Sequence, residues 1–218
     1  MFFLHEYSSN GRFSKIASMK LNSDHLKNLI EGNERFVHGE SIQDRTHLKA
    51  KREQLVAGQM PFAVIVGCSD SRVPIELVFD QDLGDLFVIR VAGNLVDELQ
   101  MASVEYAVQM FNVSLVIVLG HTHCGAVETT LDVMLGPANP DAEPNAIVEK
   151  IKPAIAGILD QGLEREDLSR QAVHLNAKRS AKTLLEGSTM LGQMHAAETL
   201  QVLSAEYDLN TGKVTLLD

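Results

Sequence analysis

Residues 62–72, with the sequence FAVIVGCSDSR, place a short apolar run directly before a polar turn. The apolar part, 62–66, is continuous, whereas a strand with one solvent-facing side alternates apolar and polar residues. A continuous run of this length is typical of a parallel strand that helices cover on both faces. Two further runs of this kind follow at 86–91 and 113–119. The pattern therefore predicts a mainly parallel β-sheet within an α/β fold.

Helical patterns alternate with these strands, which indicates a doubly wound sheet flanked by helices. The segments 74–79 and 99–111 are the expected helices between the first three strands. A loop rich in Pro, Asn and Asp at 136–144 is expected to lead into further helices. A fourth strand is expected around 200–209, and an edge strand at 214–217 follows it.

The N-terminal part of the chain precedes this alternating pattern. Segments 23–38 and 46–57 are expected to be amphipathic helices, and neither has a local partner that would bury its apolar face. We therefore expect them to form an arm, 23–57, that packs against another body such as a second subunit. Residues 1–22 are expected to be a flexible extension, and 23–218 a single domain.

Bulk composition excludes several classes of protein. A chain of 218 residues is long enough for one compact domain with a sizeable core. The net charge of −10 makes nucleic acid and anionic membranes unsuitable partners. No apolar run approaches the ~20 residues of a membrane-spanning helix. The two cysteines make no disulfide framework, so we expect a reducing compartment and a cytoplasmic location.

Two polar motifs each follow a predicted strand, at 67–72 (GCSDSR) and 120–125 (GHTHCG). Ligands of open α/β sheets bind beyond the carboxyl ends of the strands. If the two strands are neighbours, Cys68, His121 and Cys124 converge on one point. Two thiolates and one imidazole suit zinc, and three protein ligands leave the fourth position that a catalytic zinc needs. The sequence therefore predicts a catalytic Zn2+ site.

An acidic and a basic residue accompany the first predicted ligand. Asp70 is close enough to bind water on the metal or to ligate the metal itself, and Arg72 can hold Asp70 ionised through a two-pronged pair. This set suits attack by zinc-bound hydroxide on an electrophilic carbon. Taken singly, a buried cysteine is usually a small apolar residue and an Asp–Arg pair a surface ion pair. Their coincidence favours a site, in which His123 is expected to be a solvent-facing turn residue.

From about residue 24 to the C-terminus the chain resembles the β-class carbonic anhydrases. The resemblance is specific because several motifs occur in order and at family-like spacing. They are 68–72 (CSDSR), 85–94 (DLFVIRVAGN), 103–107 (SVEYA), 120–126 (GHTHCGA) and 207–214 (YDLNTGKV).

The resemblance implies a zinc enzyme that reversibly hydrates CO2 to bicarbonate and a proton. It implies Cys68, His121 and Cys124 as zinc ligands, Asp70 as an additional ligand in a closed state, and Asp70 and Arg72 as a catalytic dyad. It also implies a homodimer or a tetramer, with the N-terminal helices wrapped around the partner. The implied substrate pocket lies at the dimer interface and uses Gln59, Phe87, Tyr106 and Gly125.

One position departs from part of the family. Some members bind bicarbonate at a second, inhibitory site through a tryptophan, an arginine and a tyrosine. Arg90 and Tyr207 match two of these positions, but Ile65 occupies the tryptophan position and the chain contains no tryptophan. The sequence therefore puts this regulatory site in doubt.

Three other functions remain open at this point. Hydrolysis of carbonyl sulfide or carbon disulfide is a related chemistry on the same scaffold. A non-catalytic zinc protein that senses bicarbonate, or acts as a scaffold subunit, needs neither Asp70 nor Arg72. A cysteine phosphatase using Cys68 needs a longer phosphate-binding loop between Cys and Arg than the chain has.

Overall fold

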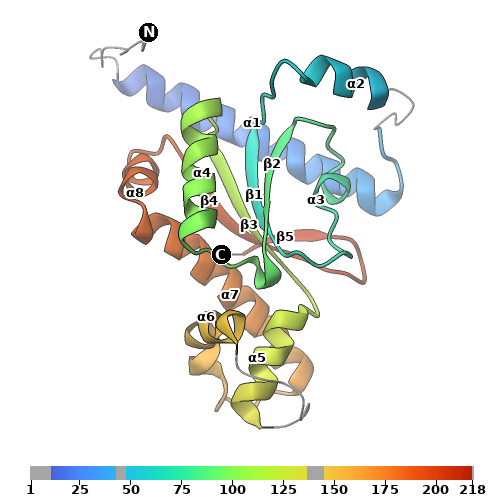
Figure 1. Cartoon of the computed structure of the whole chain (residues 1–218), viewed down its shortest axis with the longest axis vertical. Helices are drawn as coiled ribbons and strands as arrows, with labels where there is room; N and C mark the ends of the chain where they lie inside the picture. Colours follow the sequence, from blue (N-terminus) through green and yellow to red (C-terminus); the bar gives the residue numbers. More distant parts are fainter. Residues whose placement is uncertain (1–10, 43–47, 137–144, 218) are drawn as a thin grey trace.

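The computed structural model describes residues 11–42, 48–136 and 145–217, with side chains of the first helix described from residue 23 onward. Its centre is a five-stranded sheet with the order β2-β1-β3-β4-β5 (Figure 1). The first four strands are parallel, and β5 pairs antiparallel with β4. The mainly parallel sheet predicted from the sequence is confirmed. The strands are β1 (Ala63–Gly67), β2 (Leu86–Arg90), β3 (Leu115–His121), β4 (Gln201–Tyr207) and β5 (Val214–Leu217).

Helices cover both faces of the sheet and extend beyond one end of it (Figure 1). Helices α4, α7 and α8 pack on one face, and α1 and α3 on the other. Helices α5 and α6 lie past the carboxyl ends of the strands, where they pack against α7. The helices are α1 (Gly11–His38), α2 (Leu48–Leu55), α3 (Ile75–Val78), α4 (Glu98–Phe111), α5 (Gly125–Leu135), α6 (Ala146–Ile155), α7 (Arg165–Gly187) and α8 (Thr189–Ala196), with 3-10 turns η2 (Ala92–Asn94) and η3 (Ala156–Ile158).

The continuous apolar run of β1 has a direct structural cause. Successive side chains of a strand point to opposite faces. Val64 and Val66 therefore pack with α4 and α7, while Ala63 and Ile65 pack with α1 and α3. Every residue of β1 and β3 is buried. Apolar side chains are needed on both faces, so these strands do not alternate.

Several predicted boundaries are shifted: the third strand runs from Leu115 to His121 rather than from 113 to 119, and the largest error is at the first helix. The first helix begins at Gly11 rather than at residue 23, so residues 11–22, expected to be a flexible extension, are helical. No glycine or proline occurs between Gly11 and Gly32, and nothing local ends the helix. The fourth strand ends at Tyr207 rather than at 209 because the backbone N–H of Leu209 donates to Thr122 Oγ1 and leaves the ladder.

Other expected segments fall partly outside the described residues. Residues 1–10 of the expected extension and 137–144 of the expected loop lie outside them, as do 46 and 47 of the expected second helix. Within the described ranges, every helix is too short or too polar to cross a bilayer.

Polar contacts fasten α1 to the sheet. Asn33 is buried, and its Nδ2 donates to the carbonyl oxygens of Val78 and Gly212 at 3.0 and 2.9 Å. Its Oδ1 accepts the backbone N–H of Val214 at 2.8 Å. One side chain thus ties the helix to α3 and to the β5 edge of the sheet.

A buried ion pair adds a second attachment for α1, and we expect Arg35→Ala to destabilise the fold. Arg35 Nε donates to Asp80 Oδ2 at 2.6 Å, and the Asp80 side chain is only 2% exposed. Although burial opposes it, hydrogen bonds from Ser41 and Arg35 hold the pKa of Asp80 below its ordinary value. Loss of one charged hydrogen bond should cost about 2 kcal/mol of unfolding free energy.

Urea unfolding at several pH values measures this cost. Because the folded pKa of Asp80 is lowered, the stabilisation is complete above the pKa of an unfolded aspartate and fades as the pH falls through the folded pKa. The difference in unfolding free energy between wild type and Arg35→Ala should therefore become smaller in acid. Lys27→Ala removes the exposed pair with Glu31 and should cost less than about 0.5 kcal/mol. Equal losses in the two variants would contradict the expected role of the Arg35 pair.

Candidate active site

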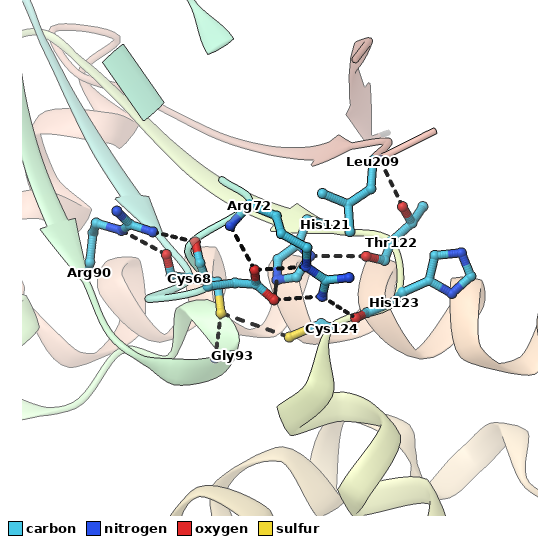
Figure 2. A network of polar contacts seen from close by, with 10 residues as sticks. Cys68, Arg72, Arg90, Gly93, His121, Thr122, His123, Cys124 and Leu209 are labelled. Atoms are coloured by element: carbon cyan, nitrogen blue, oxygen red, sulfur yellow. Dashed lines mark hydrogen bonds and ion pairs between the residues drawn. The ribbon is translucent and has the colours of Figure 1, made fainter. Parts of the chain in front are cut away.

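The two polar motifs meet where the sequence predicts. Cys68 directly follows β1, His121 is the last residue of β3, and Cys124 immediately precedes α5. Strands β1 and β3 are hydrogen-bonded neighbours, with Gly67 opposite Leu119. Both strands therefore deliver their motifs to the same edge of the sheet, and the three side chains face one another there (Figure 2).

These three side chains have the geometry of a metal site. All are buried, and their ligand atoms lie within 4.8 Å of one another. The Cys68 and Cys124 sulfurs are 4.0 Å apart, and two sulfurs at ~2.3 Å from a tetrahedral zinc would be roughly 3.8 Å apart. His121 Nδ1 lies 3.0 Å from the Thr122 carbonyl oxygen, which only accepts, so Nδ1 carries the proton.

The other imidazole nitrogen strengthens the fit. His121 Nε2 is buried and has no hydrogen-bond partner among the described residues. A buried polar atom without a partner is costly, and its lone pair faces the two thiols. The residues present therefore fit a zinc ion, which two sulfurs and one nitrogen would hold.

The pKa values of the two thiols are shifted in opposite directions. The neighbouring Cys124 thiol holds the pKa of Cys68 below its ordinary value, against the opposing effect of burial. The same contact, together with burial, raises the pKa of Cys124. A metal ion would replace the proton between the sulfurs. The position of Cys124 at the N-terminus of α5 also favours a thiolate there.

Asp70 and Arg72 form a two-pronged pair beside the three metal-ligand candidates. Arg72 Nε and Nη2 donate to the two Asp70 carboxylate oxygens at 2.9 and 2.7 Å, and Arg72 Nη2 also donates to the His123 carbonyl at 3.1 Å. These hydrogen bonds hold the pKa of Asp70 well below its ordinary value, although burial opposes them. Asp70 Oδ2 lies 3.8 Å from His121 Nε2. An ionised carboxylate therefore borders the cluster.

Sequence reasoning missed the roles of two groups that shape this site: it placed Arg90 only at an inhibitory bicarbonate site and did not single out Gly93. Arg90 Nε donates to the Cys68 carbonyl at 2.9 Å, and its Nη2 to the Asp70 carbonyl at 2.6 Å (Figure 2). The backbone N–H of Gly93 donates to Cys68 Sγ at 3.3 Å. The β1–β2 register sets Arg90 opposite Gly67, next to Cys68, and the sequence alone does not give that register. No local signal marks Gly93.

Two residues of the implied substrate pocket lie together but away from the cluster. The rings of Phe87 and Tyr106 have centroids 6.3 Å apart and share Phe111 as a neighbour. Phe87 pairs with Val64, and Cys68 lies roughly 13 Å further along the strand direction at ~3.3 Å per residue. Within one chain, these aromatic residues do not reach the three ligand candidates.

The other two implied pocket residues are separated from each other. Gln59 is exposed, lies before the amino end of β1, and lines a groove with Leu55 and Gly84. Gly125 is exposed, begins α5 and adjoins Cys124. Of the four pocket residues, Gly125 alone is adjacent in sequence to a ligand candidate.

His123 occupies the turn between the two ligands of the second motif. It is exposed and has a left-handed backbone conformation, with φ of 55°. It borders a cavity of about 500 Å³ whose other walls include Thr122, Arg165 and Arg170. The expectation of a solvent-facing turn residue is confirmed, and its ring is free of the cluster.

Comparisons with known proteins identify the family of the chain. The family described as Carbonic anhydrase matches residues 63–214. Carbonic anhydrase 2 of Mycobacterium tuberculosis is 39% identical over 88% of this chain and 91% of its own length. A carbonic anhydrase of Mycolicibacterium smegmatis is 40% identical over 87% of this chain and 90% of its own.

Solved structures show the same arrangement. The β-carbonic anhydrase CcaA superposes with a TM-score of 0.69 at 30% identity, over 89% of this chain and 88% of its own. The β-carbonic anhydrase CafA of Aspergillus fumigatus gives 0.67 at 29% identity, over 79% and 84%. The chain therefore belongs to the β-carbonic anhydrase family, and it is a carbonic anhydrase enzyme. The resemblance drawn from its motifs is confirmed.

Proposed function

We propose that the chain binds one zinc ion through Cys68, His121 and Cys124 and reversibly hydrates CO2 to bicarbonate and a proton at that site. The observation that carries the proposal is the buried His121 Nε2, which has no hydrogen-bond partner in the described part of the chain, faces two thiols and has Asp70 beside it. A purely structural zinc site is closed by four protein ligands, whereas this cluster offers three.

Zinc bound here supplies a Lewis acid that activates water for attack on an electrophilic carbon. Asp70 Oδ2 is placed to accept a hydrogen bond from that water and to orient it. Arg72 holds the pKa of Asp70 low, so Asp70 acts as an acceptor that keeps a proton only briefly before passing it to solvent. The Asp70 side chain is itself 17% exposed, so solvent reaches the carboxylate and can take that proton.

With Asp70 engaged with Arg72, a zinc ion held by the three candidates would keep its fourth position free for water. We predict that Asp70 becomes an additional metal ligand in a closed state of the site. The 3.8 Å between Asp70 Oδ2 and His121 Nε2 supports it, because the carboxylate is already at the edge of the cluster.

The CO2 pocket, as we propose it, is completed by a second copy of the chain. Gln59, Phe87 and Tyr106 lie toward the opposite end of the strands from Cys68, so a partner must supply them if they act at the site. Gly125 would contribute from the same chain as the ligands. We propose residues 23–57 as the dimerisation arm of the domain 23–218, and the cytoplasm as the location. We predict that the assembly is either a homodimer or a tetramer.

Parallel assays of zinc-loaded protein test the proposed substrate. We expect rapid CO2 hydration in a stopped-flow assay and much slower hydrolysis of carbonyl sulfide and carbon disulfide. Faster hydrolysis of carbon disulfide would favour the alternative chemistry. Tight bicarbonate binding with no turnover of any of the three would favour a bicarbonate sensor.

Bicarbonate is expected to inhibit only as a product at the metal site. Ile65 is fully buried, in the same apolar cluster as Tyr207, and Arg90 is engaged with the carbonyls of Cys68 and Asp70. Inhibition of CO2 hydration should therefore follow a simple hyperbola with bicarbonate concentration. A steep, cooperative curve, with a second bicarbonate bound near Arg90 and Tyr207, would contradict this expectation.

A further inference from the structure

The turn that carries Gly93 touches the proposed metal site directly. The backbone N–H of Gly93 donates to Cys68 Sγ at 3.3 Å (Figure 2). Gly93 has φ of 71°, and a Cβ placed on it would lie 3.1 Å from Ile151 Cδ1 and 3.3 Å from Ala126 Cβ. The backbone of this turn therefore packs tightly between Cys68 on one side and helices α5 and α6 on the other.

A side chain from another element holds the same turn. Asn176 on α7 is 1% exposed, and its Nδ2 donates to the Gly93 carbonyl oxygen at 2.7 Å. The N–H that reaches Cys68 and the carbonyl that Asn176 holds belong to the two peptide groups on either side of the Gly93 Cα. Fixing one peptide group therefore limits how far the other can turn away from the sulfur.

The choice of asparagine at this place is costly for folding. Its neighbours on α7, Val173 and Ala177, are buried and apolar, and Asn176 Oδ1 is buried without a partner among the described residues. Burying an amide with part of its hydrogen-bonding capacity unmet opposes folding. An apolar residue would remove the unmet Oδ1, but it would leave the Gly93 carbonyl without its donor.

We propose that Asn176 is a positioning residue for the metal site: by holding the Gly93 turn, it directs the Gly93 N–H at the Cys68 sulfur and so sets how Cys68 binds zinc. The inference rests on the proposed function, because it assumes that Cys68 is a zinc ligand. A hydrogen bond from Gly93 N–H fixes the Cys68 sulfur in the orientation that binds the metal, and it also lowers the energy of the filled sulfur orbitals. Groups of this kind commonly change metal affinity by ~10–100-fold.

The test uses the full chain with Asn176→Ala and with Asn176→Leu, which keeps the branched shape of the side chain at a somewhat larger volume and removes the donor. Zinc affinity is measured by competition with a chromophoric chelator. Cobalt(II), substituted for zinc, reports on the sulfur through its thiolate-to-metal charge-transfer band. The matched control is Asn33→Ala, which removes a buried asparagine whose hydrogen bonds go to the backbones of Val78, Gly212 and Val214 and not to the Gly93 turn or to Cys68.

Both Asn176 variants should bind zinc ~10–100-fold more weakly than wild type, and their charge-transfer band should move to longer wavelength. Asn33→Ala should lower the unfolding midpoint and leave zinc affinity and the band unchanged. Normal affinity and an unshifted band in Asn176→Leu would show that the residue serves packing alone, and would overturn the inference. A wild-type chain that binds no zinc would instead refute the proposed function and, with it, this inference. The two failures are therefore distinguishable.

Discussion

Alanine in place of Cys124 is expected to leave the chain without bound zinc and without measurable CO2 hydration. Cys124 supplies one of only three ligand atoms that lie within 4.8 Å of one another. Loss of a direct ligand should exceed the ~10–100-fold in affinity that loss of an outer hydrogen-bond partner costs. Metal analysis of dialysed protein and a stopped-flow assay measure the two effects. Cys68→Ala and His121→Ala should behave in the same way.

A matched pair of histidine variants controls for damage to the loop. His121 is fully buried, with Nε2 facing the thiols, whereas His123 is exposed two residues further on. We expect His123→Ala to keep one zinc per chain and His121→Ala to lose it. Full zinc occupancy in Cys124→Ala or in His121→Ala would overturn the ligand assignment.

Replacing Arg72 with alanine is expected to reduce CO2 hydration by at least the ~10²-fold typical of losing a proton-handling group, with zinc still bound. Arg72 donates three hydrogen bonds to Asp70, two from its side chain and one from its backbone N–H. Without the guanidinium, Asp70 loses both side-chain contacts and is free to move onto the metal as an additional ligand. Activity and metal content are measured on the same preparation.

Two further variants separate the roles in this pair. Arg72→Lys keeps the charge but not the planar fork, so we expect an intermediate loss of activity. Asp70→Ala removes the acceptor and should slow turnover while leaving zinc in place. Near-normal turnover in Arg72→Ala, with Asp70 away from the metal in its crystal structure, would contradict the proposed role of Arg72.

The strands and the clustering of the three ligand candidates could be predicted because their signals are local. A run such as 62–66 is apolar throughout only because both of its faces are buried, and the sequence shows that directly. The ligands follow strand ends, and parallel strands end at one edge of a sheet. Cys68, His121 and Cys124 could therefore be brought together without knowing the complete strand order.

The parts that sequence reasoning missed depend on contacts distant in the chain. Asn176 and Gly93 meet because α7 packs against η2. Asn176 belongs to no motif, and the 85–94 motif that includes Gly93 gives no sign of this contact. Arg90 donates to the backbone carbonyls of Cys68 and Asp70, a role that follows from the β1–β2 register. The start of α1 at Gly11 was missed because Ser23 and Asp24 are suitable helix caps that the longer helix does not use.

A zinc titration tests the central proposal most directly. Metal-free protein is prepared with a chelator, zinc is added in steps, and CO2 hydration is followed by stopped flow at each step. We predict that activity is absent at the start, rises in proportion to added zinc and stops rising at one zinc per chain. Undiminished activity without metal, or no activity at full zinc occupancy, would contradict the proposal that Cys68, His121 and Cys124 form a catalytic zinc site.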